Sequence, residues 1–199
     1  MLSAPEQQYI LSLTKQMIPS ILKDIGFDPS LKEPGHSFGE KLEEELVKRL
    51  IKKDDRFSPP NSSRDMADLF FNDDLINIKF GYEKKGQPNM VAFNRLVKRY
   101  LNEEIDSYWI LTIDGSDNKV CLFNLYEHLE YTNTNLGTGQ VMLCEKKFFS
   151  NFRQDKKYAV TKRDIILNLK EISKKSFEDH INLKKKQEKR RQEMFDAYL

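Results

Sequence analysis

Asp68 and Lys79 are the two residues whose types and spacing suggest chemistry most directly. They flank a short stretch in which Asn72-Asp73-Asp74 supplies good turn chemistry between two apolar runs, so the segment predicts a β-hairpin. With a two-residue turn at Asp73-Asp74, Asp68 would lie directly opposite Lys79. Alternation along the second strand predicts two faces: Leu75, Asn77 and Lys79 on one, and Ile76, Ile78 and Phe80 on the core side.

This hairpin would bring together the groups that metal-assisted hydrolysis of a phosphodiester requires. Mg²⁺ takes oxygen ligands, and a cation near the attacking water offsets the charge of the phosphate. We therefore expect Asp68, the side chain of Asn77 and the carbonyl of Ile78 to bind Mg²⁺, and Lys79 to position the nucleophile. Because an amide binds Mg²⁺ more weakly than a carboxylate, Asp73-Asp74 or an upstream glutamate is the alternative source of the second charge.

The upstream glutamates belong to a predicted helix from Glu40 to Lys53. Glu40 and Glu44 are four residues apart and share a face with Val47 and Ile51, so we expect both to point partly toward the protein. Glu40, which follows Gly39 directly, is the first candidate for the site and Glu44 the second. Glu43 and Glu45 are expected to point elsewhere. Solvated glutamates paired with neighbouring lysines are the alternative interpretation.

The combination resembles the PD-(D/E)XK nuclease superfamily, in particular type II restriction endonucleases of the EcoRV and HincII group. Asp68 matches the first Asp of the pattern and Lys79 the Lys, whereas Ala67 stands where the family usually has Pro and Asn77 where it has an acid. The Gly39-Glu40 helix resembles the one that contributes a glutamate near the metal in that group. The resemblance covers about residues 35–114 and implies a metal-dependent nuclease.

The order of the predicted elements indicates an α/β (α+β) fold, a mixed central sheet flanked by helices with a restriction-endonuclease-like core. We expect one domain over 1–199. Its predicted parts are an N-terminal helix at about 4–25, bent at Pro19, a loop at 26–39, a catalytic core at about 35–126, a helix marked by Met90, Phe93, Val97 and Tyr100, strands at 66–71, 75–80, 107–114, 119–126, 140–144 and 157–161, and a basic helical tail at about 162–199.

Basic and polar side chains around this core are candidates for contacts to double-stranded DNA. Phosphate contacts come mainly from Lys and Arg, and base edges are read by Asn, Gln and Thr in the grooves. Solvated charge on a helix face is the alternative interpretation. The candidates are Lys84, Lys85, Arg95, Lys98 and Arg99 for phosphates, Asn133, Asn135 and Gln140 for bases, and the tail from Lys184 to Arg191 for DNA or a partner subunit.

Composition sets limits on other classes of function. The chain has 199 residues, 32% of them charged, a net charge of +2, and no apolar run that would cross a membrane. The N-terminus lacks the features of a secretory signal, so we expect a cytoplasmic protein of prokaryotic type. Cys121 and Cys144 are expected to be buried thiols, and His36, His128 and His180 have no spacing typical of zinc ligands.

The sequence thus predicts a homodimeric, Mg²⁺-dependent type II restriction endonuclease with no membrane partner and no organic cofactor. A dimer follows from matching a two-fold symmetric DNA site with two equivalent active sites. Two alternatives keep the same scaffold. One is a repair or junction-resolving nuclease that recognises DNA structure, and the other is a non-catalytic DNA-binding module, for which Asn77 is the main support.

Overall fold

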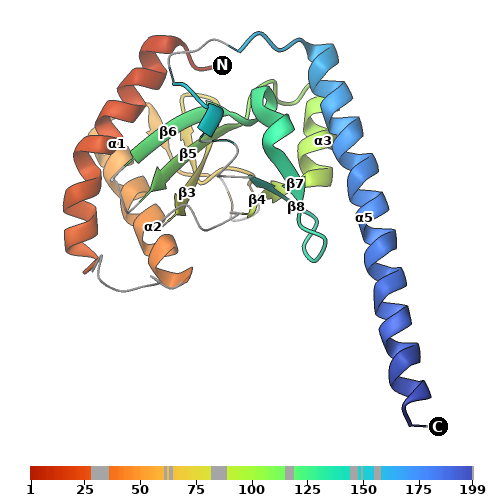
Figure 1. Ribbon diagram of the computed structural model, residues 1–199. Coiled ribbons are helices and arrows are strands. Elements are labelled where there is room, and N and C mark those ends of the chain that lie inside the picture. The colour runs from red at the N-terminus through yellow and green to blue at the C-terminus, as the bar shows by residue number, and fades with distance from the viewer. Residues whose placement is uncertain are drawn as a thin grey trace.

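A five-stranded mixed sheet forms the centre of the protein (Figure 1). The computed structural model describes residues 1–27, 36–60, 62, 65–81, 89–114, 119–143, 148, 150–154 and 158–198. The strand order is β1-β2-β3-β5-β6, with β3 parallel to β5 and the other neighbours antiparallel. The strands are β1 (Phe57–Ser58), β2 (Leu69–Phe71), β3 (Asp74–Gly81), β5 (Trp109–Asp114) and β6 (Lys119–Asn124). The predicted α/β class with a mixed sheet flanked by helices is confirmed.

Two helices cover one face of this sheet, α1 (Ala4–Asp24) and α2 (His36–Lys53) (Figure 1). The predicted helix at 4–25 is confirmed, and its capping box forms, with the Ser3 amide donating to Glu6 Oε2 at 2.8 Å. The helix predicted from Glu40 begins four residues earlier, at His36, which corrects the predicted loop. Side chains buried between these helices and the sheet include Leu42, Leu46, Leu50, Ile76, Ile78, Leu111 and Ile113.

A second group of elements covers the opposite face: α3 (Phe93–Leu101), the 3₁₀ helix η1 (Leu125–Tyr131) and a three-stranded sheet of order β4-β8-β7. Its strands are β4 (Asn89–Ala92), β7 (Thr132–Thr134) and β8 (Gln140–Leu143). Met90 lies in β4, so the predicted helix loses its first turn. Residues 125–126 continue into η1 instead of a strand, which corrects the end of the strand predicted at 119–126. Residues 158–161 form no strand, so the strand predicted at 157–161 is wrong in the part that the structure describes. Cys121 is a buried thiol, as predicted, whereas Cys144 lies outside the described residues.

The β2–β3 hairpin turns at Asn72–Asp73, one residue earlier than predicted. Leu69 pairs with Ile76, so the same register places Asp68 beside Asn77 and not opposite Lys79. Asn72 adopts φ 52°, a left-handed conformation that Asn tolerates better than most residues. Because moving the turn by one residue shifts the pairing by two, each side chain stays on its predicted face.

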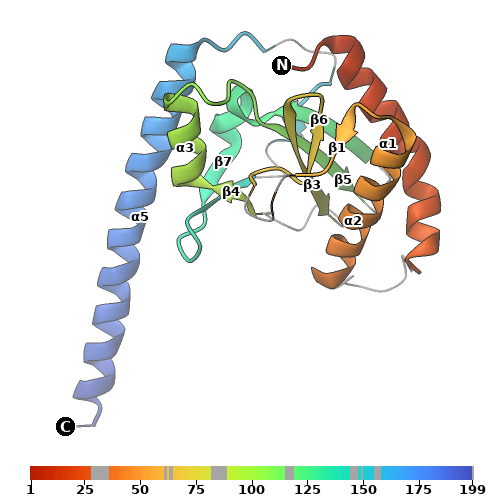
Figure 2. The same cartoon turned by 180° about the vertical axis from the view of Figure 1, so that it is seen from behind.

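The C-terminal helix α5 (Lys162–Asp196) begins against α3 and then projects beyond the rest of the protein (Figure 2). Thr161 and Asp164 form a capping box at the N-terminus of this helix. Ile165 and Leu169 are buried, whereas every residue from Phe177 to Tyr198 is exposed. Within the described parts of the chain, no helix has the length and apolar character needed to span a membrane.

Candidate active site

Lys79 lies at the centre of a cluster of charged groups on β3. Its Nζ is 3.7 Å from Asp68 Oδ2 and 3.9 Å from Glu43 Oε2, and it donates a hydrogen bond of 2.7 Å to the carbonyl of Ile78. The Lys79 side chain is 17% exposed. Both carboxylate distances exceed those of a direct hydrogen bond, so the backbone carbonyl fixes the ammonium while both acids remain close to it.

Asp68 is held by the backbone of the neighbouring strand. Its Oδ2 accepts a hydrogen bond of 2.7 Å from the Ile78 amide, and its own amide donates to the Ile76 carbonyl at 3.0 Å. Just before it, the Met66 carbonyl accepts from both the Tyr108 hydroxyl and Asn77 Nδ2. Asp68 therefore sits on a segment tied to β3 and β5, with one carboxylate oxygen fixed and its side chain 34% exposed.

Glu43, on α2, supplies the second carboxylate, which corrects the expectation that it points away. Glu40 and Glu44, the predicted candidates, are both exposed. Burial raises the pKa of Glu43 to about 7, with Asp68 adding to the increase and Lys79 opposing it. A carboxyl group that titrates near neutral pH beside a lysine is characteristic of functional sites.

The two aspartates of the hairpin turn do not join this cluster. Asp73 is exposed in the turn. Asp74 accepts hydrogen bonds from Ser107 Oγ and Trp109 Nε1 and pairs with the Met1 amino group at 3.3 Å, at the opposite end of β3 from Lys79. Of the alternatives open in the sequence, the upstream glutamate is the one that the structure brings to Lys79.

The site fits a divalent cation in part. Asp68 and Glu43 offer carboxylate oxygens, and Asn77 Oδ1 is a buried oxygen without a hydrogen-bond partner, which is the ligand type that Mg²⁺ prefers. The Ile78 carbonyl already accepts from Lys79, so it is the weakest candidate ligand. Among the described residues, no group of three or more Asp, Glu, His or Cys side chains could hold a metal. The described residues thus offer a cation two carboxylates, supplemented by amide and carbonyl oxygens.

The basic candidates for phosphate contacts lie on α3. Arg95 and Lys98 are exposed, and Arg99 is half-buried with its Nε 3.5 Å from Glu104 Oε2. Lys84 and Lys85 lie outside the described residues. Two basic side chains of α3 thus reach solvent, while Arg99 is partly occupied by an acidic neighbour.

The polar segment predicted to read bases forms the tip of the β7–β8 hairpin. Asn135 Oδ1 accepts from the backbone amides of Gly137 and Thr138, so this side chain shapes the turn. Asn133 Oδ1 accepts from Lys175 Nζ at 3.0 Å, which ties the hairpin to α5. Gln140 is half-buried at the start of β8. Asn133 and Asn135 therefore have structural roles in the hairpin, and base reading by them stays a prediction.

Comparisons with known proteins do not identify a family for this site. A scan against models of protein families finds none that matches, and a search of curated proteins finds no significant match. The function of the site is therefore inferred from the geometry of Asp68, Glu43 and Lys79.

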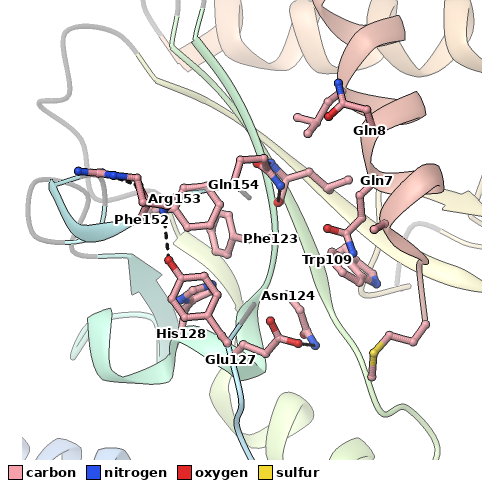
Figure 3. A pocket seen from close by; sticks show the side chains of 15 residues that line it. Gln7, Gln8, Trp109, Phe123, Asn124, Glu127, His128, Phe152, Arg153 and Gln154 are labelled. Atoms are coloured by element: carbon pink, nitrogen blue, oxygen red, sulfur yellow. Dashed lines mark hydrogen bonds between the residues drawn. The ribbon is translucent and has the colours of Figure 1, made fainter. Parts of the chain in front are cut away.

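A separate cavity of about 510 Å³ lies between α1 and the outer edge of β6 (Figure 3). Gln7 and Gln8 of α1 face Phe152 and His128 across it. The amide of Gln154 pairs with the backbone of Leu122 in both directions, at 3.1 and 2.8 Å, and so covers part of the β6 edge. None of the residues predicted for catalysis lines this cavity.

His128 makes the stability of this region sensitive to acid. It is 1% exposed, surrounded by Phe123, Phe148, Phe152 and Tyr158, and burial lowers its pKa to about 4. Below pH 6.5 His128 binds a proton in the unfolded chain but not in the folded protein, so its contribution lowers stability as pH decreases toward 4. We expect the free energy of unfolding in urea to fall between pH 7 and 4.5 by about 2–3 kcal/mol in the wild type relative to His128→Phe. The variant is the reference because Glu43 contributes with the opposite sign over this range. Equal losses in that variant and in the exposed control His180→Gln would contradict this assignment.

Proposed function

We propose that the protein hydrolyses phosphodiester bonds in double-stranded DNA with Mg²⁺, as a sequence-specific endonuclease of the PD-(D/E)XK kind. The observation that carries the proposal is the placement of Lys79 within 4 Å of two carboxylates that come from separate elements, Asp68 before β2 and Glu43 on α2. Glu43 is half-buried, and its pKa is raised although Lys79 lies close by. This also supports a functional role, because an ion pair at the surface is worth little and does not raise the pKa of its own acid.

Each side chain has a distinct role in the proposed reaction. Asp68, Glu43 and the carbonyl oxygen of Asn77 would hold Mg²⁺, which stabilises negative charge on the phosphate when bound. The Lys79 ammonium orients the attacking water and offsets the charge that develops at phosphorus. The attacking water gives up a proton to solvent as its oxygen forms the new bond to phosphorus and the bond to the leaving oxygen breaks, and the leaving oxygen takes up a proton from solvent.

The proposal also covers the oligomeric state of the protein and its location in the cell. A homodimer with two equivalent sites would match a two-fold symmetric DNA sequence and cut both strands. The proposed location is the cytoplasm. One alternative is a DNA-binding module that uses this scaffold without catalysis. It is favoured by Asn77 and by the lack of a third metal-binding side chain in the cluster among the described residues.

Cleavage assays on natural DNA test the proposal. Purified protein is incubated with phage or plasmid DNA in Mg²⁺ or in EDTA, and the products are separated on a gel. We expect discrete bands that form only with Mg²⁺ and that locate the recognition sequence. Cutting restricted to branched DNA would replace sequence-specific cleavage with junction resolution. Intact DNA in both conditions, together with retained DNA binding, would establish the non-catalytic alternative.

A further inference from the structure

The free half of α5 carries the highest density of positive charge in the described protein. Six of the eight residues from Lys184 to Arg191, here called the basic arm, are Lys or Arg, and one is Glu. The whole chain has a net charge of only +2, so the rest of the protein is net acidic. All residues of the arm are exposed. The charge of this protein is therefore concentrated on a single projecting helix.

The arm extends far from the core that anchors it. Ile165 and Leu169 are buried at the base of α5, and Lys175 contacts Asn133 on β7. From Lys175 to Asp196 the helix continues for about 30 Å, which is nearly one turn of a B-form duplex. A helix of this length gains little from its own propensity and has no apolar stripe through the arm, so a charged partner is the natural complement.

The distribution of charge around the helix discriminates between partners. Successive residues are about 100° apart, so Lys184, Lys185 and Lys186 already face three different directions, and Lys189, Arg190 and Arg191 fill the gaps between them. Pairing with a second α5 would bring some of these cations close together, and their like charges would repel. A groove of DNA presents phosphates on both of its walls, so positive charge on all sides of a helix is matched there.

The arm also points to the side on which the candidate active site lies. β3 starts at Asp74, beside the N-terminus, and runs toward the side from which α5 projects (Figures 1 and 2). The start of α2 and the tip of the β7–β8 hairpin lie on that side too (Figures 1 and 2). Lys79 and Glu43 belong to the two elements that lead there, so one duplex placed against this side would face both the cluster and the arm.

We infer that the basic arm is a nucleic-acid-binding element that binds the phosphate backbone of a duplex beside the candidate active site. This inference rests on the proposed DNA substrate and adds the structural element that supplies most of the affinity. Within the described parts of the chain, the ion pairs of the arm involve Lys189 with Glu193 and Arg191 with Glu188, so most of its charge is available.

Binding measured without metal separates the arm from catalysis. A fluorescent duplex is titrated in EDTA with the full chain, with Lys184→Gln/Lys185→Gln/Lys186→Gln, with the same three positions changed to Arg, and with a control, Lys15→Gln/Lys52→Gln/Lys53→Gln, on α1 and α2. Gln is a good helix former, so circular dichroism of all variants should match. We expect the arm Gln variant to bind at least about tenfold more weakly at 0.1 M salt, with the slope of log K against log salt reduced by about 2–3. The Arg variant and the control should stay within about twofold of wild type.

Each other outcome identifies what has failed. If the arm Gln variant has the same DNA affinity and salt slope as the wild type, the inferred role of the arm is overturned, even if the wild type cuts DNA. Strong arm-dependent binding by a chain that never cuts would keep the arm and remove the proposed catalysis. Unchanged DNA binding combined with tighter self-association of the Gln variant, measured by sedimentation, would show that α5 joins two copies of the chain.

Discussion

Replacing Lys79 with Ala is expected to lower the rate of Mg²⁺-dependent DNA cleavage by at least about 10³-fold while leaving DNA binding within a few-fold of wild type. Lys79 supplies the only ammonium within 4 Å of both Asp68 and Glu43 among the described residues. Its removal takes away the group that orients water and offsets charge at the phosphate. Affinity depends on many separate phosphate contacts and so depends little on this one side chain. Rates come from single-turnover cleavage of a short duplex, and affinity comes from titration in EDTA.

Two further variants make this result specific to the ammonium. Lys79→Met keeps the aliphatic stem that packs beside the sheet, so a loss of activity shared with Lys79→Ala excludes a packing defect. Lys15→Ala removes an exposed lysine from α1 and should cut at the wild-type rate. Cleavage by both Lys79 variants at close to the wild-type rate would refute the assignment of this cluster as the active site.

The sequence allowed the elements around this cluster to be predicted because their patterns are local. The capping box at Ser3, the alternation along β3 and the cap at Thr161 each depend on residues a few positions apart. The same holds for the face shared by Asn77 and Lys79, which survives the change in register. Local patterns therefore sufficed for the fold class and for two members of the cluster.

Glu43 was missed because α2 carries two apolar stripes. Val47 and Ile51 suggested one buried face, but Leu42, Leu46 and Leu50 are the residues that are 0% exposed. On a helix with about 100° per residue, Glu43 lies roughly 60° from the centre of the leucine stripe and Glu44 roughly 160°. The leucine repeat was visible in the sequence, but the choice between the stripes depends on which face of α2 meets the sheet.

Of the smaller sheet only β8 was predicted from the sequence, because β4 and β7 are short and β4 pairs with a strand far away in the sequence. β4 contributes four residues and β7 three, and β4 pairs with β8 about fifty residues later. Such short strands are set by their partners more than by their own propensity. Asn133 was therefore predicted only as part of a polar, base-reading segment, although it lies in β7.

Between pH 5 and pH 8 in EDTA, the free energy of unfolding of the wild type is expected to fall by about 2 kcal/mol relative to that of Glu43→Gln. The comparison with the variant is needed because His128 contributes to the wild type with the opposite sign over this range. Burial raises the pKa of Glu43 to about 7 in the folded state, against an ordinary value of 4.5. Between these values the folded chain keeps a proton that the unfolded chain has lost, so stability decreases as pH rises through about 7. Gln is uncharged at every pH and carries no such cost. The free energy of unfolding in urea, measured at several pH values, tests this directly.

Glu44→Gln is the matched control, because Glu44 is an exposed residue next to Glu43 on the same helix. It should keep the wild-type dependence on pH. If the free energy of unfolding of Glu43→Gln changes between pH 5 and 8 by the same amount as that of the wild type, Glu43 is not the group responsible. The same ionisation should appear in catalysis with the opposite sign, because the deprotonated carboxylate is the form that binds Mg²⁺. Cleavage by the wild type is therefore expected to increase as pH rises through about 7, where the apo protein becomes less stable.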